Sequence, residues 1–305
     1  MLSLLQRYQQ QCRITKVMRK GCGMTLTIRH LRETDIARLD RILVTAFATA
    51  NSFKKQLQRY RAIQPDGWFV AELDRTLVGM VGAMDYGEFA YIGLMAVHPT
   101  VQRRGIGRAL MERLLDWLDA RGTNVARLDA TEAGARLYSL FGFVEDSKRL
   151  VFQRDRTTHS PASPSRVRTL CKEDLSALAA FDAPIFGANR LSVFAVYLSE
   201  LPDRAFVTYD EVGQITGYLF VQPAILGPWA ASTPKAAEAL LSMALQEPCD
   251  RVYCVLVPSA NRAAANLLER YGFIQQRELS HMRRGEIAAP SQPEMLYGLG
   301  SFAIG

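Results

Sequence analysis

The sequence predicts an α+β fold, in three layers of helices and sheet, built as two tandem copies of one domain. Its 305 residues suffice for two domains of ordinary size. Residues 94–143 align with residues 224–273 without a gap, at an offset of 130. Both copies show the order strand, helices, three strands, helix, strand, helix, strand. This order predicts a mixed, mostly antiparallel sheet flanked by helices in each copy.

Each copy begins with a strand that leads into a helix. The segment Thr27–Ile36 resembles Arg166–Leu175, and both contain an acidic turn. Asp35 and Asp174 stand near the start of the helix, where the helix dipole favours an anion. This pair of segments predicts the same strand-to-helix turn at the start of both copies.

A hairpin and a long helix follow. Trp68–Gly79 resembles Ala205–Gly217, and in both a polar turn separates two apolar runs, as in a hairpin. In the first copy we expect strands over residues 69–73, 76–85 and 89–97. A helix from about Gly105 to Arg121 is predicted by an apolar stripe at near-3.6 spacing, made of Ile106, Leu110, Leu114, Leu115 and Leu118.

Matched residues continue to the end of each copy and set the expected domain boundaries. Ala109-Leu110 falls on Ala239-Leu240, Leu137 on Leu267, and Gly142-Phe143 on Gly272-Phe273. We expect a flexible basic arm or an over-long start assignment at 1–23, the first domain at 24–153, and the second at 167–305. The polar segment 154–166, with Pro161 and Pro164, is expected to be a linker.

Composition excludes several classes of protein. The chain is 49% apolar and 22% charged, as in globular proteins, and it has no apolar run of eighteen residues. Of the net charge of +7, five charges lie in residues 1–23, so the folded part is nearly neutral and offers no basic surface for nucleic acid. Five cysteines and four histidines lack metal-ligand spacing, so no metal is expected. We expect a cytoplasmic protein that binds neither nucleic acid nor membrane.

The segment Tyr91–Leu110 has the pattern of an anion-binding loop. An apolar strand ends at Val97, a turn carries Gln102, Arg103 and Arg104, and a helix opens with Gly105, Ile106, Gly107 and Arg108. Glycines let a ligand approach the backbone, and the first helical turn has free N–H groups and a positive dipole end. The combination suits a pyrophosphate. A Walker A loop would need Gly-Lys-Ser/Thr, and a dinucleotide fingerprint would need a small residue at Leu110, so neither fits.

Two motifs resemble those of the GNAT N-acetyltransferase superfamily. Gln102-x-x-Gly105-x-Gly107 is similar to its coenzyme A loop, and Ala130–Phe143 to its final helix with Leu-Tyr-x-x-x-Gly-Phe. The resemblance covers about residues 25–153. It implies two tandem acyl-CoA N-acyltransferase-like domains, with acetyl-CoA as co-substrate and an amine as acceptor.

The resemblance also implies roles for single residues. Gln102 through Arg108 would bind the pyrophosphate, and the strand residues Met95, Ala96 and Val97 would lie along the pantetheine arm, with an N–H near Val97 aimed at the thioester carbonyl. Thr131 stands where many relatives have asparagine. Tyr138 matches the tyrosine whose hydroxyl protonates the departing thiolate, or else it is a packed aromatic residue.

The general base is left open by the sequence. An alkyl ammonium with a pKa near 10.4 costs about 4–5 kcal/mol to deprotonate at pH 7, so a base or a less basic amine is needed. Asp85, Glu88, Asp129 and Glu132 are the nearby acids. We expect each to be an exposed turn acid or a helix-start residue, and take Glu88 as the weakly favoured catalytic candidate.

The second copy lacks the residues that would hold a coenzyme. At the offset of 130, Gln102 becomes Ser232, Gly105 becomes Lys235, Gly107 becomes Ala237 and Tyr138 becomes Leu268, and Arg104 is likewise replaced by Pro234. We therefore expect a degenerate half. The segment 225–231 around Trp229 is either plain core or the lining of an acceptor site between the halves, and the apolar tail 295–305 is expected to pack as a terminal strand.

The sequence thus predicts an acetyl-CoA-dependent N-acetyltransferase acting on a small-molecule amine by direct attack on the thioester. Two alternatives stay open: a non-catalytic protein that senses acyl-CoA, and an acetyltransferase for protein lysines or N-termini. The sequence does not reveal the acceptor or the oligomeric state.

Overall fold

The computed structural model describes residues 14–15, 24–154, 166–247, 253–286 and 291–305. Within them the chain forms two compact units, and neither coincides with a sequence repeat. One unit holds the residues up to Asp85 together with Ile92–Thr123, and the other holds Tyr86–Tyr91 together with Asn124–Gly305. Each unit is described by itself below.

The first unit is an antiparallel sheet with helices packed against it. Its strands pair in the order β1, β2, β3, β4, and β4 lies beside β5. Helix α2 packs against β4, and α4 packs against β2, β3 and β4. The elements are β1 (Ile14–Thr15), β2 (Leu26–His30), η1 (Glu33–Asp35), α2 (Ile36–Ala46), α3 (Lys54–Ile63), β3 (Trp68–Leu73), β4 (Thr76–Asp85), β5 (Ala90–Val97), η2 (Pro99–Val101) and α4 (Ile106–Arg121).

The core of this unit confirms the amphipathic pattern of the long helix. All five residues of the predicted apolar stripe on α4 are buried. Trp68 is fully buried, stacks on Tyr60 at 5.5 Å between ring centroids, and donates from Nε1 to the Tyr60 carbonyl oxygen. A side chain at Gly82 would collide with the Trp68 ring, since its Cβ would lie 1.8 Å from Cε3. Glycine at position 82 therefore lets the tryptophan lie flat on the sheet.

The second unit contains two sets of paired strands. One runs β6, β13, β7, β12, with the first two residues of β5 paired in parallel with β6; the other runs β14, β11, β10, β9, β8. The elements are β6 (Ala126–Ala130), α5 (Glu132–Ser139), β7 (Val144–Arg154), β8 (Val167–Thr169), η3 (Lys172–Asp174), α6 (Leu175–Phe186), α7 (Leu191–Glu200), β9 (Ala205–Tyr209), β10 (Ile215–Val221), β11 (Leu226–Ala231), α8 (Pro234–Ala244), β12 (Tyr253–Pro258), α9 (Arg262–Arg270), β13 (Ile274–Arg284), η4 (Pro293–Met295) and β14 (Leu296–Gly298).

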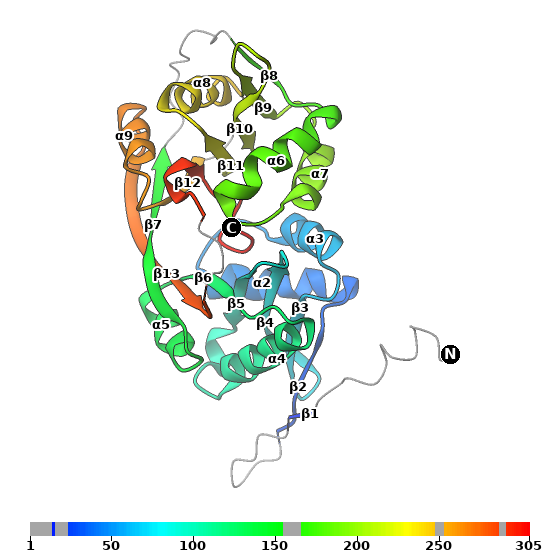
Figure 1. Ribbon diagram of the computed structural model, residues 1–305. Coiled ribbons are helices and arrows are strands. Elements are labelled where there is room, and N and C mark those ends of the chain that lie inside the picture. The colour runs from blue at the N-terminus through cyan, green and yellow to red at the C-terminus, as the bar shows by residue number, and fades with distance from the viewer. Residues whose placement is uncertain (1–13, 16–23, 155–165, 248–252, 287–290) are drawn as a thin grey trace, which may run out of the picture. The chain divides into compact units, whose positions relative to one another are not determined.

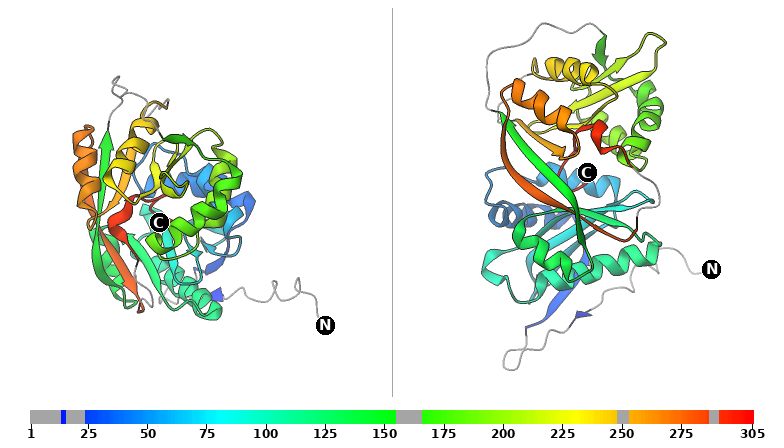
Figure 2. Two further views of the ribbon diagram at one scale, coloured as in Figure 1. Left: turned by 45° about the horizontal axis from the view of Figure 1, so that its top comes forward. Right: turned by 60° about the vertical axis from the view of Figure 1, so that its left-hand side comes forward.

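The two repeats exchange their long terminal strands. Strand β13 of the second repeat pairs with β6 of the first, and β7 of the first repeat pairs with β12 of the second. The two long strands also pair with each other in an antiparallel ladder, and they run side by side in Figures 1 and 2. Each repeat therefore completes the sheet of the other. This is why the compact units cut across the sequence repeats.

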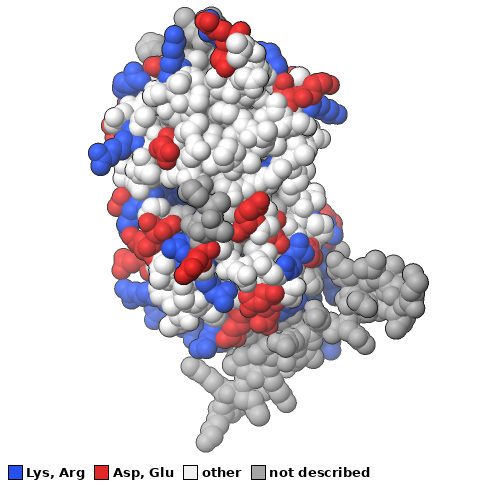
Figure 3. Space-filling view, viewed as in Figure 1, with Lys and Arg blue, Asp and Glu red and all other residues white. Residues whose placement is uncertain are grey.

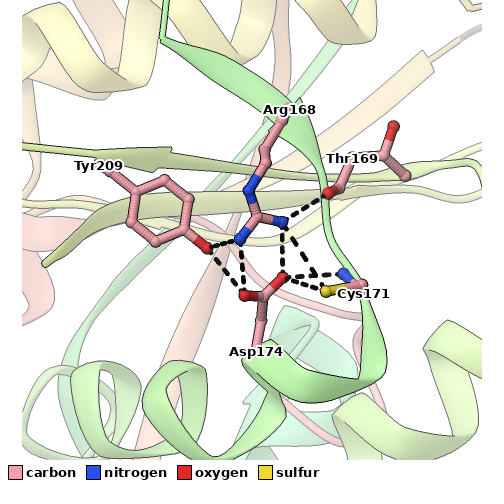
Figure 4. A network of polar contacts seen from close by, with 5 residues as sticks. All are labelled: Arg168, Thr169, Cys171, Asp174 and Tyr209. Carbon is pink, nitrogen blue, oxygen red and sulfur yellow. Dashed lines mark hydrogen bonds and ion pairs between the residues drawn. The ribbon is translucent and has the colours of Figure 1, made fainter. Parts of the chain in front are cut away.

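The same bidentate ion pair fixes the start of both repeats. In the second repeat, Arg168 binds Asp174 through Nη1 (2.8 Å) and Nη2 (2.7 Å), and the hydroxyl of Tyr209 donates to the same carboxylate (Figure 4). In the first repeat, Arg29 binds Asp35 at 2.7 and 2.9 Å. Both acids also accept a backbone N–H three residues earlier in the chain. The structure thus confirms the repeated strand-to-helix turn and gives its physical cause.

The predicted order of elements is confirmed in both repeats. The expected strands 69–73, 76–85 and 89–97 and the helix after Gly105 lie within a residue or so of β3, β4, β5 and α4. The predicted terminal strand in the tail is present as the short β14. Most of the proposed linker, and most of residues 1–23, lie outside the described residues.

Charge on the face shown in Figure 3 is mixed in sign. Lysine and arginine alternate with aspartate and glutamate, and little charge appears over α6 and α7. These two helices contain only Asp182 and Glu200 as charged residues. Among the described residues, no helix combines the length and hydropathy needed to cross a bilayer.

Candidate active site

The loop between β5 and α4 has the backbone geometry of an anion-binding turn. Arg103 has φ +59° and Gly105 has φ +82°, so the chain enters the left-handed region twice within three residues. The Gln102 side chain braces the turn by donating from Nε2 to the Val97 carbonyl oxygen at 2.9 Å. A Cβ at Gly105 would meet nothing within 4 Å, so the space beside the loop backbone is open. Alternating backbone conformations of this kind turn successive N–H groups toward one point.

The first turn of α4 adds donors and positive charge to this loop. The N–H groups of Ile106, Gly107 and Arg108 lie in the first turn of a sixteen-residue helix, where no intrahelical acceptor exists. Arg103 and Arg104 are exposed and have no acidic partner among the described residues, whereas Arg108 pairs with Glu112 at 2.9 Å. The turn therefore offers free N–H groups and two unpaired cations to an anion, as a pyrophosphate requires.

Strand β5 carries an irregularity that the sequence did not reveal. Leu94 has φ +53°, a conformation that is strained for a branched side chain in the middle of a strand. It lies just before Met95, Ala96 and Val97, the residues predicted to line the pantetheine arm. The next strand approaches closely here, since a Cβ at Gly79 would lie 2.6 Å from the Ala96 carbonyl oxygen. No composition signal marks such a strained residue within a strand.

Tyr138 lies in the second unit, on α5, with its ring buried and its hydroxyl free. The helix begins at Thr131, whose side chain accepts the Gly134 N–H at 3.2 Å as an N-cap. Tyr138 is 8% exposed, packs against Phe143, and has no hydrogen-bond partner among the described residues. Burial raises the pKa of its hydroxyl well above the ordinary value. The phenol is therefore protonated at neutral pH, and it is a weaker acid than an exposed tyrosine.

The four acids considered as bases have different surroundings. Glu88 is exposed in the turn between β4 and β5, as expected, and Glu132 is exposed in the first turn of α5, paired with Arg136. Asp85 accepts from Arg121 at 2.6 Å and from Thr123 at 3.0 Å. The expectation of an exposed acid is wrong for Asp85, whose side chain is 6% exposed, and for Asp129, which lies in β6 with its side chain completely buried.

Asp129 is the centre of a buried polar network that the sequence did not predict. It accepts from the Tyr91 hydroxyl at 2.6 Å, is bonded to His281 Nδ1 at 2.9 Å, and accepts from Arg149 Nε at 3.4 Å. Burial alone would raise the pKa of Asp129, but the charge of Arg149 and the bond to His281 outweigh it and lower this pKa to about 2. Burial lowers the pKa of His281, and it is the main cause.

No sequence signal could have identified this network. His281 lies on β13 and faces Asp129 across the β6–β13 ladder, where the two residues are direct cross-strand neighbours. That ladder exists only because the repeats exchange strands. Asp129 and His281 are 152 positions apart in the sequence, and only the fold makes them neighbours.

The described residues of the second repeat show no comparable anion-binding turn at the matching position. Helix α8 begins after Thr233, whose side chain caps it by accepting the Ala236 N–H at 3.2 Å, and its first residue is Pro234. Ala237 is fully buried, and Leu268, in place of the tyrosine, is fully buried in the core as well. A proline without an N–H and a self-capped turn leave fewer donors for a ligand. The replacements seen in the sequence therefore change the local structure.

The chain's own tail lies between two strands of the second repeat. The isolated bridge Ile225–Cys254 joins the segment before β11 to β12, and β14 lies between these two strands. On one side β14 pairs with β11, through Leu296 with Ala230 and Gly298 with Trp229.

Contacts on the other side complete this arrangement. The Leu299 N–H donates to the Leu256 carbonyl oxygen of β12 at 3.0 Å, and Asn261 Nδ2 donates to the Leu296 carbonyl oxygen, also at 3.0 Å. A Cβ at Gly298 would lie 2.7 Å from the Leu226 carbonyl oxygen, so the fit needs glycine. Trp229 is fully buried against Tyr297 and belongs to the core of this region.

Comparisons with known proteins agree with this architecture. A model of the Acetyltransferase (GNAT) family matches residues 36–143, and a model of an acetyltransferase (GNAT) domain matches residues 178–298. Together they account for both repeats. The chain belongs to the GNAT N-acetyltransferase superfamily. It is a tandem GNAT protein and an N-acetyltransferase in the general sense of that superfamily.

Similar proteins match this chain over most of their length. The uncharacterized N-acetyltransferase YitH of Bacillus subtilis is 28% identical over 240 residues, covering 75% of this chain and 81% of that protein. A putative acetyltransferase from Pyrococcus horikoshii has a TM-score of 0.80 at 26% identity, covering 95% of this chain and 99% of that one. A tandem GNAT protein from the clavulanic acid biosynthesis pathway shares the fold, with a TM-score of 0.62 at 17% identity, covering 87% of this GNAT chain and 99% of that one.

Proposed function

We propose that the first repeat binds acetyl-CoA and transfers its acetyl group to the amine of a small molecule by direct attack on the thioester. The observation that carries the proposal is the loop Gln102–Arg108. It combines two residues in the left-handed region, a first helical turn whose N–H groups have no intrahelical acceptor, and two arginines without an acidic partner among the described residues. Acetyl-CoA supplies the activated acetyl group and a diphosphate that such a loop can hold.

Residues Met95 to Val97 and Tyr138 are the candidates for the transfer itself. Backbone N–H groups after Leu94, which has φ +53°, would stabilise the negative charge that grows on the thioester oxygen. The hydroxyl of Tyr138 would give its proton to the departing thiolate, and a weak acid suffices because a thiol with an ordinary pKa near 8.5 is a good leaving group. Thr131, where many relatives have an asparagine that contacts the coenzyme, caps α5. Glu88 stays the candidate base for the incoming amine.

The second repeat supports this reaction without binding a coenzyme of its own. Its strand β14 lies between β11 and β12, and its helix α8 starts with proline. Its strand β13 completes the sheet next to β6. We therefore expect one coenzyme per chain, and a second repeat that acts as scaffold.

Thiol release with a panel of small amines tests the proposal. Steady release of free coenzyme A that depends on the amine, together with calorimetric binding of one acetyl-CoA per chain, is expected. Tight binding of acetyl-CoA without release with any amine would instead mark a sensor of acyl-CoA. Release only with lysine peptides or protein N-termini would assign a macromolecular acceptor.

A further inference from the structure

A buried arginine on β6 has no partner for its charge. Arg127 is 7% exposed, and its Nε is buried without a hydrogen bond. Its guanidinium lies 4.0 Å from the centroid of the Phe89 ring, and no acid pairs with it among the described residues. A buried cation that lacks an anion is costly, and proteins normally pair it. Arg127 is therefore built to meet a charge from outside the chain.

The arginines nearest to Arg127 outnumber the carboxylates that pair with them by one. Arg149 and Arg283 are the cations that act most strongly on Arg127, and the carboxylates that pair with these two are Asp129 and Asp146. Asp129 is used by Arg149, and Asp146 lies 3.7 Å from Arg283. Burial lowers the pKa of His281, so this side chain is neutral at pH 7 and adds no charge. One monovalent anion would balance the cluster.

Arg127 lies on the face of β6 that is turned away from α5. Alternate residues of a strand point to opposite faces, so Arg127 and Asp129 share one face while Ala130 is on the other. Ala130, Lys148 and Ser280 line an open groove together with the α5 residues Glu132, Ala135, Arg136 and Ser139. Tyr138, the candidate proton donor, is on α5 as well. Strand β6 therefore lies between α5, which carries the candidate proton donor Tyr138, and the guanidinium of Arg127.

A glycine lies beside the guanidinium of Arg127. Gly187 has φ +94°, and a Cβ added there would lie 3.9 Å from Arg127 Nη1, in ordinary contact, and 3.3 Å from Ser291 Cβ. The guanidinium offers paired N–H donors in a plane, the geometry that a carboxylate accepts with both oxygens.

We propose that Arg127 binds the carboxylate of the acceptor, so that the substrate is an amine that also carries a carboxylate, of the amino-acid class. This rests on the proposed function, since it names the acceptor of the same reaction. A carboxylate has the single charge that the cluster lacks, whereas a phosphate dianion would exceed it. A planar monoanion also matches the free guanidinium of Arg127.

Matched substrates test the inference on the unaltered protein. Amino acids and their amides have the same amine and nearly the same size, but the amide has no charge. We expect the amino acid to be acetylated with a kcat/KM roughly 10- to 100-fold above that of its amide, the factor expected for a charge-assisted hydrogen-bond pair. Equal values for acid and amide would overturn the inference.

Variants separate binding from packing. Arg127→Gln should raise KM for the acid and leave the amide unaffected, and Arg127→Lys should restore part of the preference because it keeps the charge. Arg136→Gln, an exposed arginine on α5, is the matched control and should change neither substrate. If Arg127→Gln impairs acid and amide equally, or unfolds the protein while Arg127→Lys binds both alike, Arg127 is a structural residue and the inference is wrong.

A binding experiment distinguishes a failure of this inference from a failure of the proposed function. Thermal shift and calorimetry with N-acetyl amino acids, the expected products, need no turnover. Binding that is lost in Arg127→Gln supports the carboxylate site even if no amine releases thiol, in which case only the proposed transfer fails. Binding of N-acetyl amino acids that is unchanged in Arg127→Gln overturns the site even if the enzyme turns over.

Discussion

Asn261 Nδ2 donates a 3.0 Å hydrogen bond to the Leu296 carbonyl oxygen, while its Oδ1 accepts the Ala264 N–H at 2.9 Å. One buried side chain thus caps α9 and holds the tail strand β14. Thr131, at the matching position of the first repeat, caps α5 and holds no such strand. In the second repeat this polar position binds the protein's own backbone.

This double role predicts unequal effects for two matched substitutions. Asn261→Ala removes a cap and leaves a buried carbonyl without its donor, so it should lower the free energy of unfolding by about 2–3 kcal/mol. Thr131→Ala removes only an exposed cap and should cost about 1 kcal/mol. Urea unfolding of both variants measures the difference. Equal losses would mean that the bond to Leu296 contributes nothing.

Gly107→Glu should abolish binding of acetyl-CoA. The carboxylate would stand in the first turn of α4, at the expected place of the pyrophosphate, and two anions there repel each other. The fold should not suffer, because an acid in the first turn favours the helix dipole. Calorimetry measures the affinity and thermal unfolding the stability.

Lys235→Glu is the matched control for this variant. It places the same charge in the first turn of α8, in the second repeat, and should leave the affinity unchanged. Unaltered affinity for acetyl-CoA in Gly107→Glu would contradict the assignment of the loop. Weakened affinity in Lys235→Glu would indicate that the second repeat binds the coenzyme.

Tyr138→Phe should lower turnover and leave acetyl-CoA affinity as it is. The variant keeps the buried ring beside Phe143 and removes only the proton donor. Because a thiol is a good leaving group, we expect a loss in kcat of about 100-fold or less, at the low end for general acid catalysis. Tyr271→Phe, a tyrosine of the second repeat bonded to Ser242 and Glu238, serves as the control. An unchanged kcat would make Tyr138 a packing residue only.

The Asp129 network predicts how stability depends on acidity. The pKa of Asp129 is lowered from 3.8 to about 2 in the folded protein, so its contribution is present above pH 4 and is lost as the pH falls toward 2. The expected loss is about 2 kcal/mol. The pKa of His281 is lowered as well, so acidification below about 6.5 already favours the unfolded state, which binds this proton more readily.

Urea unfolding between pH 7 and pH 3 measures this dependence. His281→Gln should flatten the curve between pH 6.5 and 5, and Asp129→Asn should flatten it below pH 4 while lowering stability throughout. A wild-type curve that is level from pH 6.5 to 3 would show that neither group has the shifted pKa.

The repeated ion pair of Figure 4 predicts a comparison between the two repeats. Arg29 and Arg168 make the same bidentate contact, but the Arg29 side chain is 12% exposed and that of Arg168 is 48% exposed. Water screens the second pair more. Arg29→Gln should therefore cost about 3 kcal/mol and Arg168→Gln about 1 kcal/mol or less in urea unfolding. The reverse order would mean that burial does not decide the strength of this contact.

The sequence alone determined the order of elements, the duplication and the glycine-containing loop between β5 and α4. These features depend on local rules: apolar spacing along α4, acidic turns at Asp35 and Asp174, and glycines at the start of a helix. Such rules act over a few residues, and the offset of 130 shows them twice. The same local evidence misjudged Asp129, because a short polar stretch at the end of a strand looks the same whether it is buried or exposed.

Only the tertiary structure decided which residues meet across the repeats. The exchange of β7 and β13 brings His281 to Asp129, and the tertiary structure also places β14 beside Asn261 and leaves Arg127 with no counter-charge among the described residues. Strand pairing uses backbone groups, which every residue has, so the sequence contains no code for which long strand joins which sheet. The choice follows from how the whole chain buries its apolar surface, and the polar network and the unpaired cation follow from that choice.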